Sequence, residues 1–134
     1  MNSVSSIAQS GLAAAVLHVQ VAANNIANAQ SSGPVPGSPA DGSYPNAYVA
    51  QRVAQSEAPG GDVNARVTTA SPGSAQEFDP TAPYADANGM VMNPNVDFVG
   101  EVLGLMTAKL NFAANIAVMR TYSQMQQALV DIKS

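Results

Sequence analysis

Few side chains in this sequence are of the types that catalyse reactions or bind metals. His18 is the only histidine, and no acidic residue lies near it in the sequence; a packed or interfacial imidazole is therefore expected rather than a ligand or a general base. Glu77 and Asp79 are close together, but paired carboxylates need a pocket to act as acid and base, and Phe78-Asp79-Pro80 is typical of an extended connector. The absence of cysteine excludes disulfides, thiolate chemistry and cysteine-ligated metals.

One segment carries a fragment of a calcium-binding pattern. Asp86-Ala87-Asn88-Gly89 has the spacing of the first ligands of an EF-hand loop. A usable loop needs further oxygen ligands and a glutamate at a fixed position, so we predict a turn here. The sequence therefore predicts a protein that is not an enzyme and has no catalytic residues, no cofactor, no metal ion and no small-molecule substrate.

The composition also argues against a self-sufficient compact core. Of the 134 residues 46% are hydrophobic, but much of that fraction is alanine, there is no tryptophan, and four tyrosines and three phenylalanines are the only aromatic residues. Large core-forming side chains are thus scarce. The net charge of −4 comes without the basic stripe that a phosphate backbone requires, so no nucleic acid is expected as a partner.

Three zones of different composition predict the organisation of the chain. Residues 1–32 should form an N-terminal helix, residues 33–94 a loop region with a short hairpin, and residues 95–134 a long C-terminal helix. The central zone carries all nine prolines, which breaks any helical pattern there. We therefore expect a mainly α fold, in which the two terminal helices pair in a coiled-coil-like manner and a small β-hairpin lies between them in the sequence.

The N-terminal zone has the heptad rhythm of a helix that packs against a partner. Its apolar residues recur at spacings of 4, 3, 4, 3, 4 and 3, at Ala8, Leu12, Ala15, Val19, Ala22, Ile26 and Ala29. Ser6 and Gln9 could form a capping box, although a start nearer Ser3 is equally compatible. Gly33 and Pro34 supply a stop signal, so the helix is predicted from about residue 4 to 30.

The C-terminal zone has a much broader apolar stripe. One side carries Val102, Leu105, Phe112, Ile116, Met119, Tyr122, Met125, Leu129 and Ile132. Beside it lie Val99, Leu103, Met106, Leu110, Ala113 and Ala117. Such a stripe exceeds what one alanine-rich helix can cover, so the central segment or another subunit must bury the remainder.

The central zone contains two strand-like segments, residues 48–53 and 63–68, separated by Pro59-Gly60-Gly61-Asp62. A small hairpin is the simplest interpretation. Because two strands alone are marginally stable in water, the hairpin should lean on the C-terminal helix or on a neighbouring subunit.

An uncharged stripe of side-chain amides runs along the first helix, at Gln20, Asn24, Asn25 and Asn28. The stripe could be an ordinary solvated surface or an interface held by amides. A free helix surface normally carries lysine and glutamate, and neither occurs in the first forty residues. We therefore favour an interface with other subunits.

Two motifs give these patterns a family context. Ala22-Ala23-Asn24-Asn25-Ile26-Ala27-Asn28-Ala29, with Ser10-Gly11-Leu12 upstream, resembles the N-terminal signature of bacterial flagellar rod and hook proteins. The stretch from Asp86 to Asp97, followed by Lys109-Leu110-Asn111-Phe112-Ala113-Ala114-Asn115, is similar to proximal-rod proteins of the FlgC type. The segment that follows the first helix departs from the family, which usually has threonines, an aromatic residue and a basic pair there.

The resemblance implies a structural subunit of the proximal rod. In the axial proteins of this family the terminal helices form a coiled-coil inner domain, called D0. Stacked copies make a tube around an export channel, and this tube transmits torque toward the hook. The implied partners are copies of the chain itself, other rod proteins, the membrane-embedded ring, the export-gate and adaptor proteins at the rod base, and the flagellar type III export apparatus. The implied location is the basal-body rod in the periplasmic space.

Specific interface residues follow from these patterns. We expect Leu12, Val19 and Ile26 to pair within the chain with Leu105, Phe112, Ile116 and Met119. The amides of Gln20, Asn24, Asn25 and Asn28 should contact other subunits, and Met125 and Leu129 complete the predicted interface.

The segment before Asp41 carries no charged side chain, so export without a cleavable signal peptide is expected. The alternative function is a secreted helical adaptor or chaperone-like binding module that presents its apolar stripe to one partner.

Overall fold

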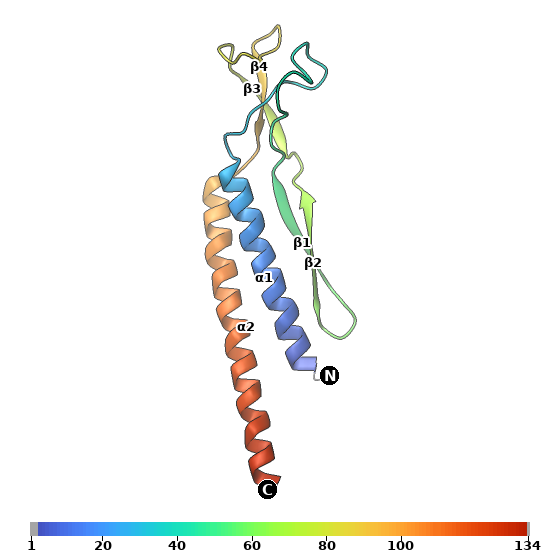
Figure 1. The fold of residues 1–134 in the computed structure, drawn as a ribbon, viewed down its shortest axis with the longest axis vertical. Helices are drawn as coiled ribbons and strands as arrows, with labels where there is room; N and C mark the ends of the chain where they lie inside the picture. The colour runs from blue at the N-terminus through green and yellow to red at the C-terminus, as the bar shows by residue number, and fades with distance from the viewer. Residues whose placement is uncertain (1–2, 134) are drawn as a thin grey trace.

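The computed structural model describes residues 3–133 and shows an elongated molecule built around two long helices (Figure 1). The elements follow the order α1 (Ser3–Ala27), β1 (Gln51–Glu57), β2 (Val63–Thr69), β3 (Ser74–Phe78), β4 (Met90–Pro94) and α2 (Phe98–Lys133). Two separate two-stranded sheets, β1–β2 and β3–β4, lie between the helices in the sequence. The mainly helical class and the small strand region predicted from the sequence are confirmed.

Helix α1 is slightly shorter than predicted. It already includes Ser3, so the alternative start is the one observed, and Ser6 lies inside the helix instead of capping it. It ends at Ala27, where the Asn28 amide still donates to the Asn24 carbonyl at 3.1 Å and the chain then turns. At ~1.5 Å per residue, the 25 residues make a rod of about 37 Å.

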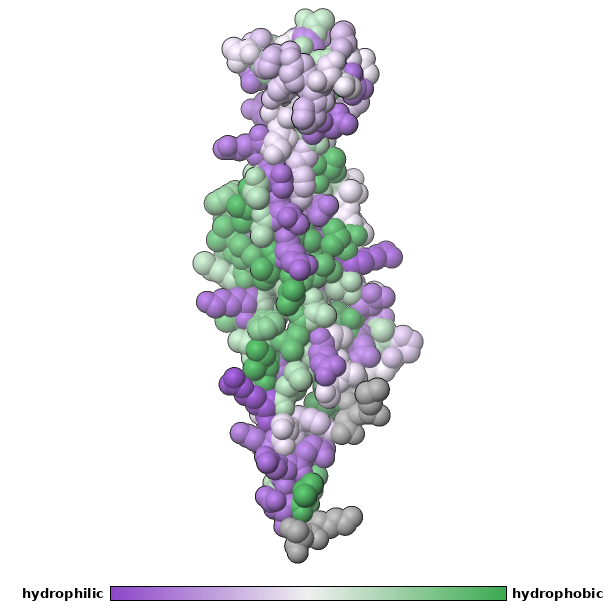
Figure 2. Space-filling view, viewed as in Figure 1, coloured by the Kyte–Doolittle hydropathy of each residue, from purple (hydrophilic) through white to green (hydrophobic). Residues whose placement is uncertain are grey.

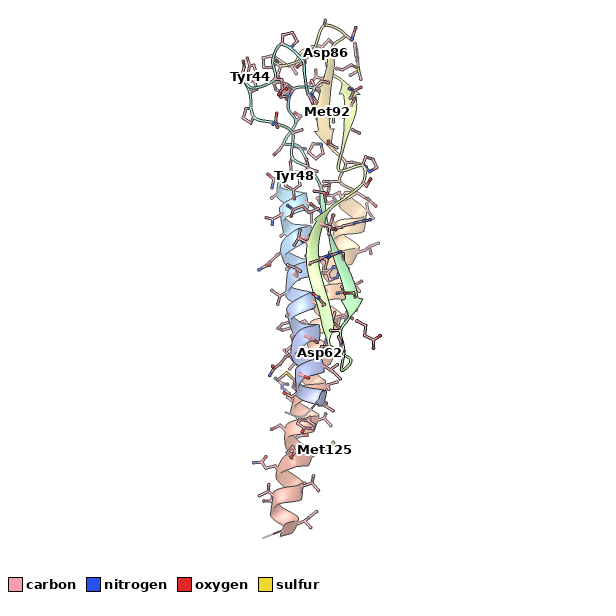
Figure 3. All side chains as sticks on the ribbon, turned by 90° about the vertical axis from the view of Figure 1, so that its right-hand side faces the viewer. Tyr44, Tyr48, Asp62, Asp86, Met92 and Met125 are labelled. Atoms are coloured by element: carbon pink, nitrogen blue, oxygen red, sulfur yellow. The ribbon has the colours of Figure 1, made fainter. Side chains whose placement is uncertain are left out.

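Helix α2 is longer than α1 and extends beyond it. Its 36 residues correspond to about 54 Å. The helices run antiparallel, since Gly11 lies against Asn115 near one end of the contact and Asn25 bonds to Glu101 near the other. The last turns of α2 therefore project past the start of α1, as Figure 1 shows, and Met125 lies near this end in Figure 3.

The predicted hairpin is present, but it packs on a different helix from the one expected. Strands β1 and β2 are antiparallel, with Gln51 opposite Thr69 and Glu57 opposite Val63. The hairpin packs along α1. Within residues 3–133, no Cα atom of β1 or β2 lies within 8 Å of a Cα atom of α2. Helix α1 is thus the middle layer between α2 and the hairpin, and the expectation that the hairpin leans on the C-terminal helix is wrong.

A second hairpin, which the sequence did not predict, forms a head beyond the ends of α1 and α2. Strands β3 and β4 are antiparallel, with Phe78 opposite Met90, and Gly33 adds an isolated bridge to Met92 (Figures 1 and 3). The head also contains a tilted ring contact between Tyr44 and Tyr84, with centroids 5.6 Å apart. The predicted turn at Asp86 is confirmed as part of the loop between the two strands.

Gly33 has a different role from the helix terminator that its position suggested. Its amide donates to the Met92 carbonyl at 3.0 Å, and the Met92 amide donates back to the Gly33 carbonyl at 2.9 Å. A Cβ atom at this position would lie 2.4 Å from the Ala47 nitrogen and 2.5 Å from the Pro45 oxygen. Close backbone packing in the head therefore requires glycine here.

Candidate subunit interface

The contact between the helices is made chiefly by small residues of α1. Ala8, Ala15 and Ala22 are buried and lie seven residues apart, as the predicted seam requires. A Cβ atom at Gly11 would lie 2.8 Å from the side-chain amide of Asn115 on α2, so that helix passes very close at this level. Small side chains thus allow the two helix backbones to approach one another.

The large seam residues lie at the margins of this contact. Leu12 and Ile26 are half-buried, and Val19 is 40% exposed. Val19 and Phe112 line the same apolar groove of about 280 Å³ between the two helices. This groove brings together one residue from each side of the predicted pairing, whereas the pairing of the other named residues stays a prediction.

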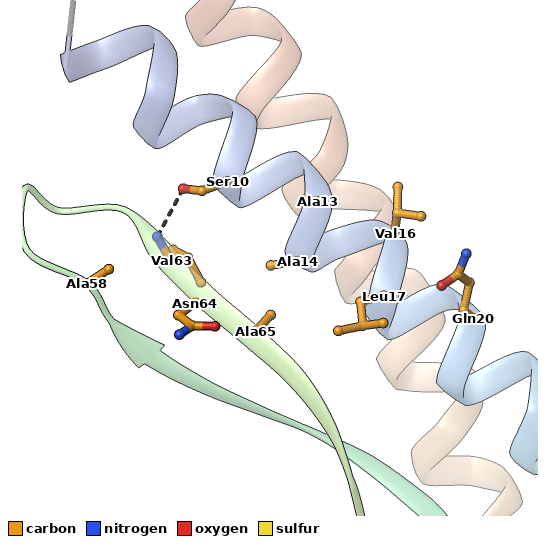
Figure 4. Close-up of a pocket in the computed structure, with 10 residues that line it drawn as sticks. All are labelled: Ser10, Ala13, Ala14, Val16, Leu17, Gln20, Ala58, Val63, Asn64 and Ala65. Carbon is orange, nitrogen blue, oxygen red and sulfur yellow. Dashed lines mark hydrogen bonds between the residues drawn. The ribbon is translucent and has the colours of Figure 1, made fainter. Parts of the chain in front are cut away.

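A second face of α1 holds the β1–β2 hairpin through polar anchors. The Val63 amide donates to Ser10 Oγ at 2.9 Å at one end of the hairpin (Figure 4). Midway along the helix, Gln55 Nε2 and His18 Nε2 are 3.0 Å apart, which gives the single histidine a packing role. Buried Ala14 and Val21 lie on the same side of the helix, between these anchors in the sequence.

Asn25 is the third anchor and the most buried polar residue described, with 0% of its surface exposed. Its Oδ1 accepts from the Gln51 amide at 2.9 Å, and its Nδ2 donates to the Gln51 carbonyl at 2.7 Å. The N–H and C=O of one strand residue point to the same side, so the asparagine side chain pairs with the edge of β1 as another strand would.

The same amide has two further partners. Tyr48 donates its hydroxyl to Asn25 Oδ1 at 2.9 Å, and Asn25 Nδ2 donates to Glu101 Oε1 of α2 at 2.5 Å. Burial raises the pKa of the Tyr48 hydroxyl, and the nearby Glu101 charge raises it further. The hydroxyl therefore stays protonated and able to donate.

The predicted amide stripe divides into residues with different environments. Gln20 and Asn24 are exposed, as an interface with other subunits requires. Asn28 is half-buried and donates to the Asn24 carbonyl at 2.9 Å within its own chain. The prediction that the Asn25 amide contacts other subunits is wrong, because its donors and acceptor are all engaged inside the chain.

Helix α2 leaves most of its apolar surface uncovered. Glu101, Ala108 and Asn115, which are seven residues apart, face α1. On the opposite side lies a row that we call the back row, whose members have exposed fractions of 58 to 70%: Val99, Leu103, Met106 and Leu110. Figure 2 shows hydrophobic surface gathered on the helical part of the molecule, whereas the head is mostly hydrophilic or neutral.

The other predicted residues of α2 fall into two groups. Leu105, Ile116 and Met119 are half-buried, toward the side of α1. Met125 and Leu129 are exposed, and Ile132 near the projecting end is 83% exposed. Met125 also lines an apolar groove of about 360 Å³ with Val4 at the start of α1. The last turns of α2 thus carry apolar side chains beyond the reach of α1.

Comparison with known proteins identifies the family. The flagellar basal-body rod protein FlgC of Salmonella typhimurium is 40% identical over 121 residues, which cover 89% of this chain and 87% of the relative. The chain belongs to the family of flagellar basal-body rod proteins FlgC. The FlgC protein of Escherichia coli O157:H7 is 37% identical over the same length, and that of Agrobacterium fabrum is 30% identical over 134 residues, which cover 98% of this chain and 94% of the relative.

A protein-family model also matches the part of the chain that carries the uncovered apolar surface. The C-terminal region of flagellar basal body rod proteins FlgEFG matches residues 87–132, which comprise β4 and nearly all of α2. The resemblance inferred from the motifs around Asn24 and Asn95 is thereby confirmed. FlgC proteins are structural proteins of the flagellar rod by name, a class not known for enzyme activity.

The groups weighed for chemistry have structural partners in this FlgC-family chain. Asp86 Oδ1 accepts the amides of Asn88 and Met90 at 2.8 and 2.9 Å, which closes the predicted turn. Hydrogen bonds from Thr81, first from its hydroxyl and then from its amide, hold the pKa of Asp79 below its usual value. Within residues 3–133, no cluster of three histidine, aspartate or glutamate side chains could hold a metal ion.

A groove of about 460 Å³ lies between α1 and β2 (Figure 4). Its lining is mostly alanine, valine and leucine, and the polar side chains contributed by the described residues are those of Ser10, Gln20 and Asn64. Such a lining has no group that titrates near neutral pH, so the groove does not resemble a catalytic pocket.

Both helices are long and apolar enough to cross a bilayer by length and composition. The hairpin, however, lies alongside α1 and exposes Arg52, Glu57 and Arg66. Charged side chains and an open sheet edge are not tolerated in hydrocarbon. The geometry therefore favours protein partners for the apolar surface of α1 and α2.

Proposed function

We propose that this chain is a structural subunit of the proximal rod in the flagellar basal body. It assembles helically with its neighbours around the export channel and transmits torque from the motor toward the hook. The observation that carries this proposal is the back row of α2, a heptad-spaced apolar surface opposite the helix that already covers the other side. Apolar rows on two opposite sides of a helix are normally both buried, and neighbouring subunits supply the missing cover for the back row.

The proposed subunit has an inner part and an outer part. Residues 1–32 and 95–134 form the inner, D0-like domain with coiled-coil geometry, and residues 33–94 form the loop and strand region. The proposed interface with other subunits includes the back row, the amide side chains of Gln20, Asn24 and Asn28, and the apolar side chains of Met125 and Leu129. The proposed pairing of Leu12, Val19 and Ile26 with Leu105, Phe112, Ile116 and Met119 lies within the chain.

The proposed partners are copies of the chain, other rod proteins, the membrane-embedded ring and the proteins of the export gate at the rod base. Delivery to the periplasm through the flagellar type III apparatus, without a cleavable signal, completes the proposal. Imaging of purified basal bodies by electron cryo-microscopy tests it directly. Density for this chain in the rod is the expected result, and basal bodies that lack the chain in motile cells would refute the proposal.

The Leu110→Arg variant tests the back row. Leu110 is 70% exposed, so arginine, a good helix former, should leave the helix content of the lone chain unchanged. In the assembly the same charge would be buried without a partner, which should weaken each subunit interface that contains it by about 3 to 5 kcal/mol. We expect loss of incorporation into basal bodies and of swimming in soft agar.

Leu110→Met is the matched control, because this swap conserves volume and polarity and should keep both incorporation and swimming. Normal motility with arginine at position 110 would mean that the back row faces solvent in the rod.

Asn24→Asp tests the exposed part of the amide stripe. A carboxylate at this position should weaken assembly, because the interface buries a charge that has no cation nearby in the first forty residues. Motility and the yield of rods are the measurements, with Asn24→Gln as the variant that keeps the amide. If the aspartate variant assembled and swam like the parent, the interface role of this amide would be ruled out.

A further inference from the structure

Asn25 is the point at which α1, the β1–β2 hairpin and α2 meet. A side-chain amide has two donor hydrogens and two acceptor lone pairs, and all four are used here. Three of the bonds go to the hairpin side, two to Gln51 and one to Tyr48. The fourth goes to Glu101 on α2.

This amide is also the link between the hairpin and α2. The hairpin packs on α1, and in the described part of the chain, residues 3–133, the Cα atoms of its strands lie more than 8 Å from those of α2. It is held by the anchors at Ser10, His18 and Asn25 rather than by a deep apolar core, since most side chains of its strands are exposed or half-buried. Asn25 is the residue of α1 that bonds both to α2 and to the hairpin side, so it offers a direct route for an effect of α2 on the seating of the hairpin.

We propose that Asn25 couples the packing of α2 on α1 to the seating of the hairpin on α1, so that each event favours the other. Either partner fixes the rotamer of the asparagine, and the second partner then binds an amide that is already ordered. Both partners also exclude water from the amide, which strengthens the hydrogen bonds that remain. Because coupling is reciprocal, the seated hairpin strengthens the helix pairing by the same factor.

The consequence for assembly rests on the proposed function. In an assembling chain the coupling would favour the docking of the C-terminal helix and the seating of the hairpin together, so that subunits with only one of the two in place are less populated. The coupling itself is a property of one chain and can be measured without any partner.

The absence of cysteine allows α2 to be stapled to α1 at a chosen site. A Cβ atom at Gly11 would lie 3.0 Å from Asn115 Cγ, so the two Cβ atoms lie within about 4.5 Å, a separation that a disulfide can span. In the full-length Gly11→Cys/Asn115→Cys chain, hydrogen exchange of the Gln51 amide reports the seating of the hairpin at Asn25.

We expect oxidation of this staple to slow exchange of the Gln51 amide at least fivefold more than in the same chain carrying Glu101→Leu. Glu101→Gln keeps an acceptor oxygen and should retain the coupling, whereas Asn25→Ala should lose it. The comparison between glutamine and leucine separates the hydrogen bond from general tightening of the helices, which both variants share.

Three results would overturn the proposal. Equal slowing with leucine and with glutamate at position 101 would show that the coupling passes elsewhere. If Glu101→Gln lost the coupling as Glu101→Leu does, the acceptor oxygen at position 101 would not be its cause. If the Gln51 amide stayed unprotected in the oxidised chain, the hairpin would not be seated on Asn25. If the chain were absent from basal bodies, the proposed function would fail, but the coupling measured on the lone chain would stand.

Discussion

Asn25→Asp is expected to destabilise the lone chain by about 3 kcal/mol or more, whereas the same substitution at the neighbouring Asn24 should change its stability by less than about 0.5 kcal/mol. The carboxylate at position 25 loses the two donor hydrogens that bind the Gln51 carbonyl and Glu101. It also places a second negative charge against Glu101, at a site with 0% exposure. Asn24 is exposed, so its substitution buries nothing in the lone chain.

The deficit at position 25 should depend on pH. Burial and the Glu101 charge both disfavour ionisation, so the pKa of the introduced carboxyl in the folded chain lies above its unfolded value of about 3.9. A raised folded-state pKa means that the folded chain binds the proton more tightly. The destabilisation is therefore smallest below about pH 4 and grows as the pH rises through the folded-state pKa.

Thermal unfolding followed by circular dichroism, at several pH values, measures both effects on the two variants. The adjacent pair is its own control, because charge, side-chain size and sequence context are nearly matched. A similar loss of stability in both variants, or a pH-independent one at position 25, would contradict the buried network.

The contrast between these two asparagines shows what the sequence patterns did not predict, namely which of the two is buried inside the chain. Both residues belong to the same motif, and the sequence favoured the same outward role for both. They differ by one residue, which rotates the side chain by about 100° around the helix, from solvent to the hairpin. A second row on α1, at spacings of 4, 7 and 4, was the signal that could have revealed the hairpin face, and it comprises half-buried Ser10 and buried Ala14, Val21 and Asn25.

The features with regular spacing were predictable. The two helices, the first hairpin and the excess apolar surface of α2 each follow from a local period, and the structure contains all of them. The second hairpin was missed because β3 mixes polar and apolar residues and is separated from β4 by residues 79–89. The choice of α1 as the support of the first hairpin depends on side-chain anchors at Ser10, His18 and Asn25, which a search for apolar periodicity alone does not detect.

Gly33→Ala is the other substitution with a large expected effect. The added methyl group would meet three backbone atoms of residues 45 to 47 at 2.4 to 2.7 Å, and backbone cannot move aside as a flexible side chain can. Overpacking of a tight site costs typically about 1 to 3 kcal/mol, and we expect the upper end of that range because the paired bonds between Gly33 and Met92 must also break or shift.

Exchange of the Met92 amide, which donates to the Gly33 carbonyl, should accelerate by about a hundredfold for a loss near 3 kcal/mol. Gly104→Ala is the matched control. A Cβ atom there meets nothing within 4 Å, and the residue lies inside α2, so alanine should stabilise the helix by about 0.8 to 1 kcal/mol. Because the two substitutions are chemically identical, opposite signs isolate the close backbone approach at position 33 as the cause. An alanine at position 33 that left the protection of Met92 unchanged would mean that the head packs more loosely around this glycine than the contacts require.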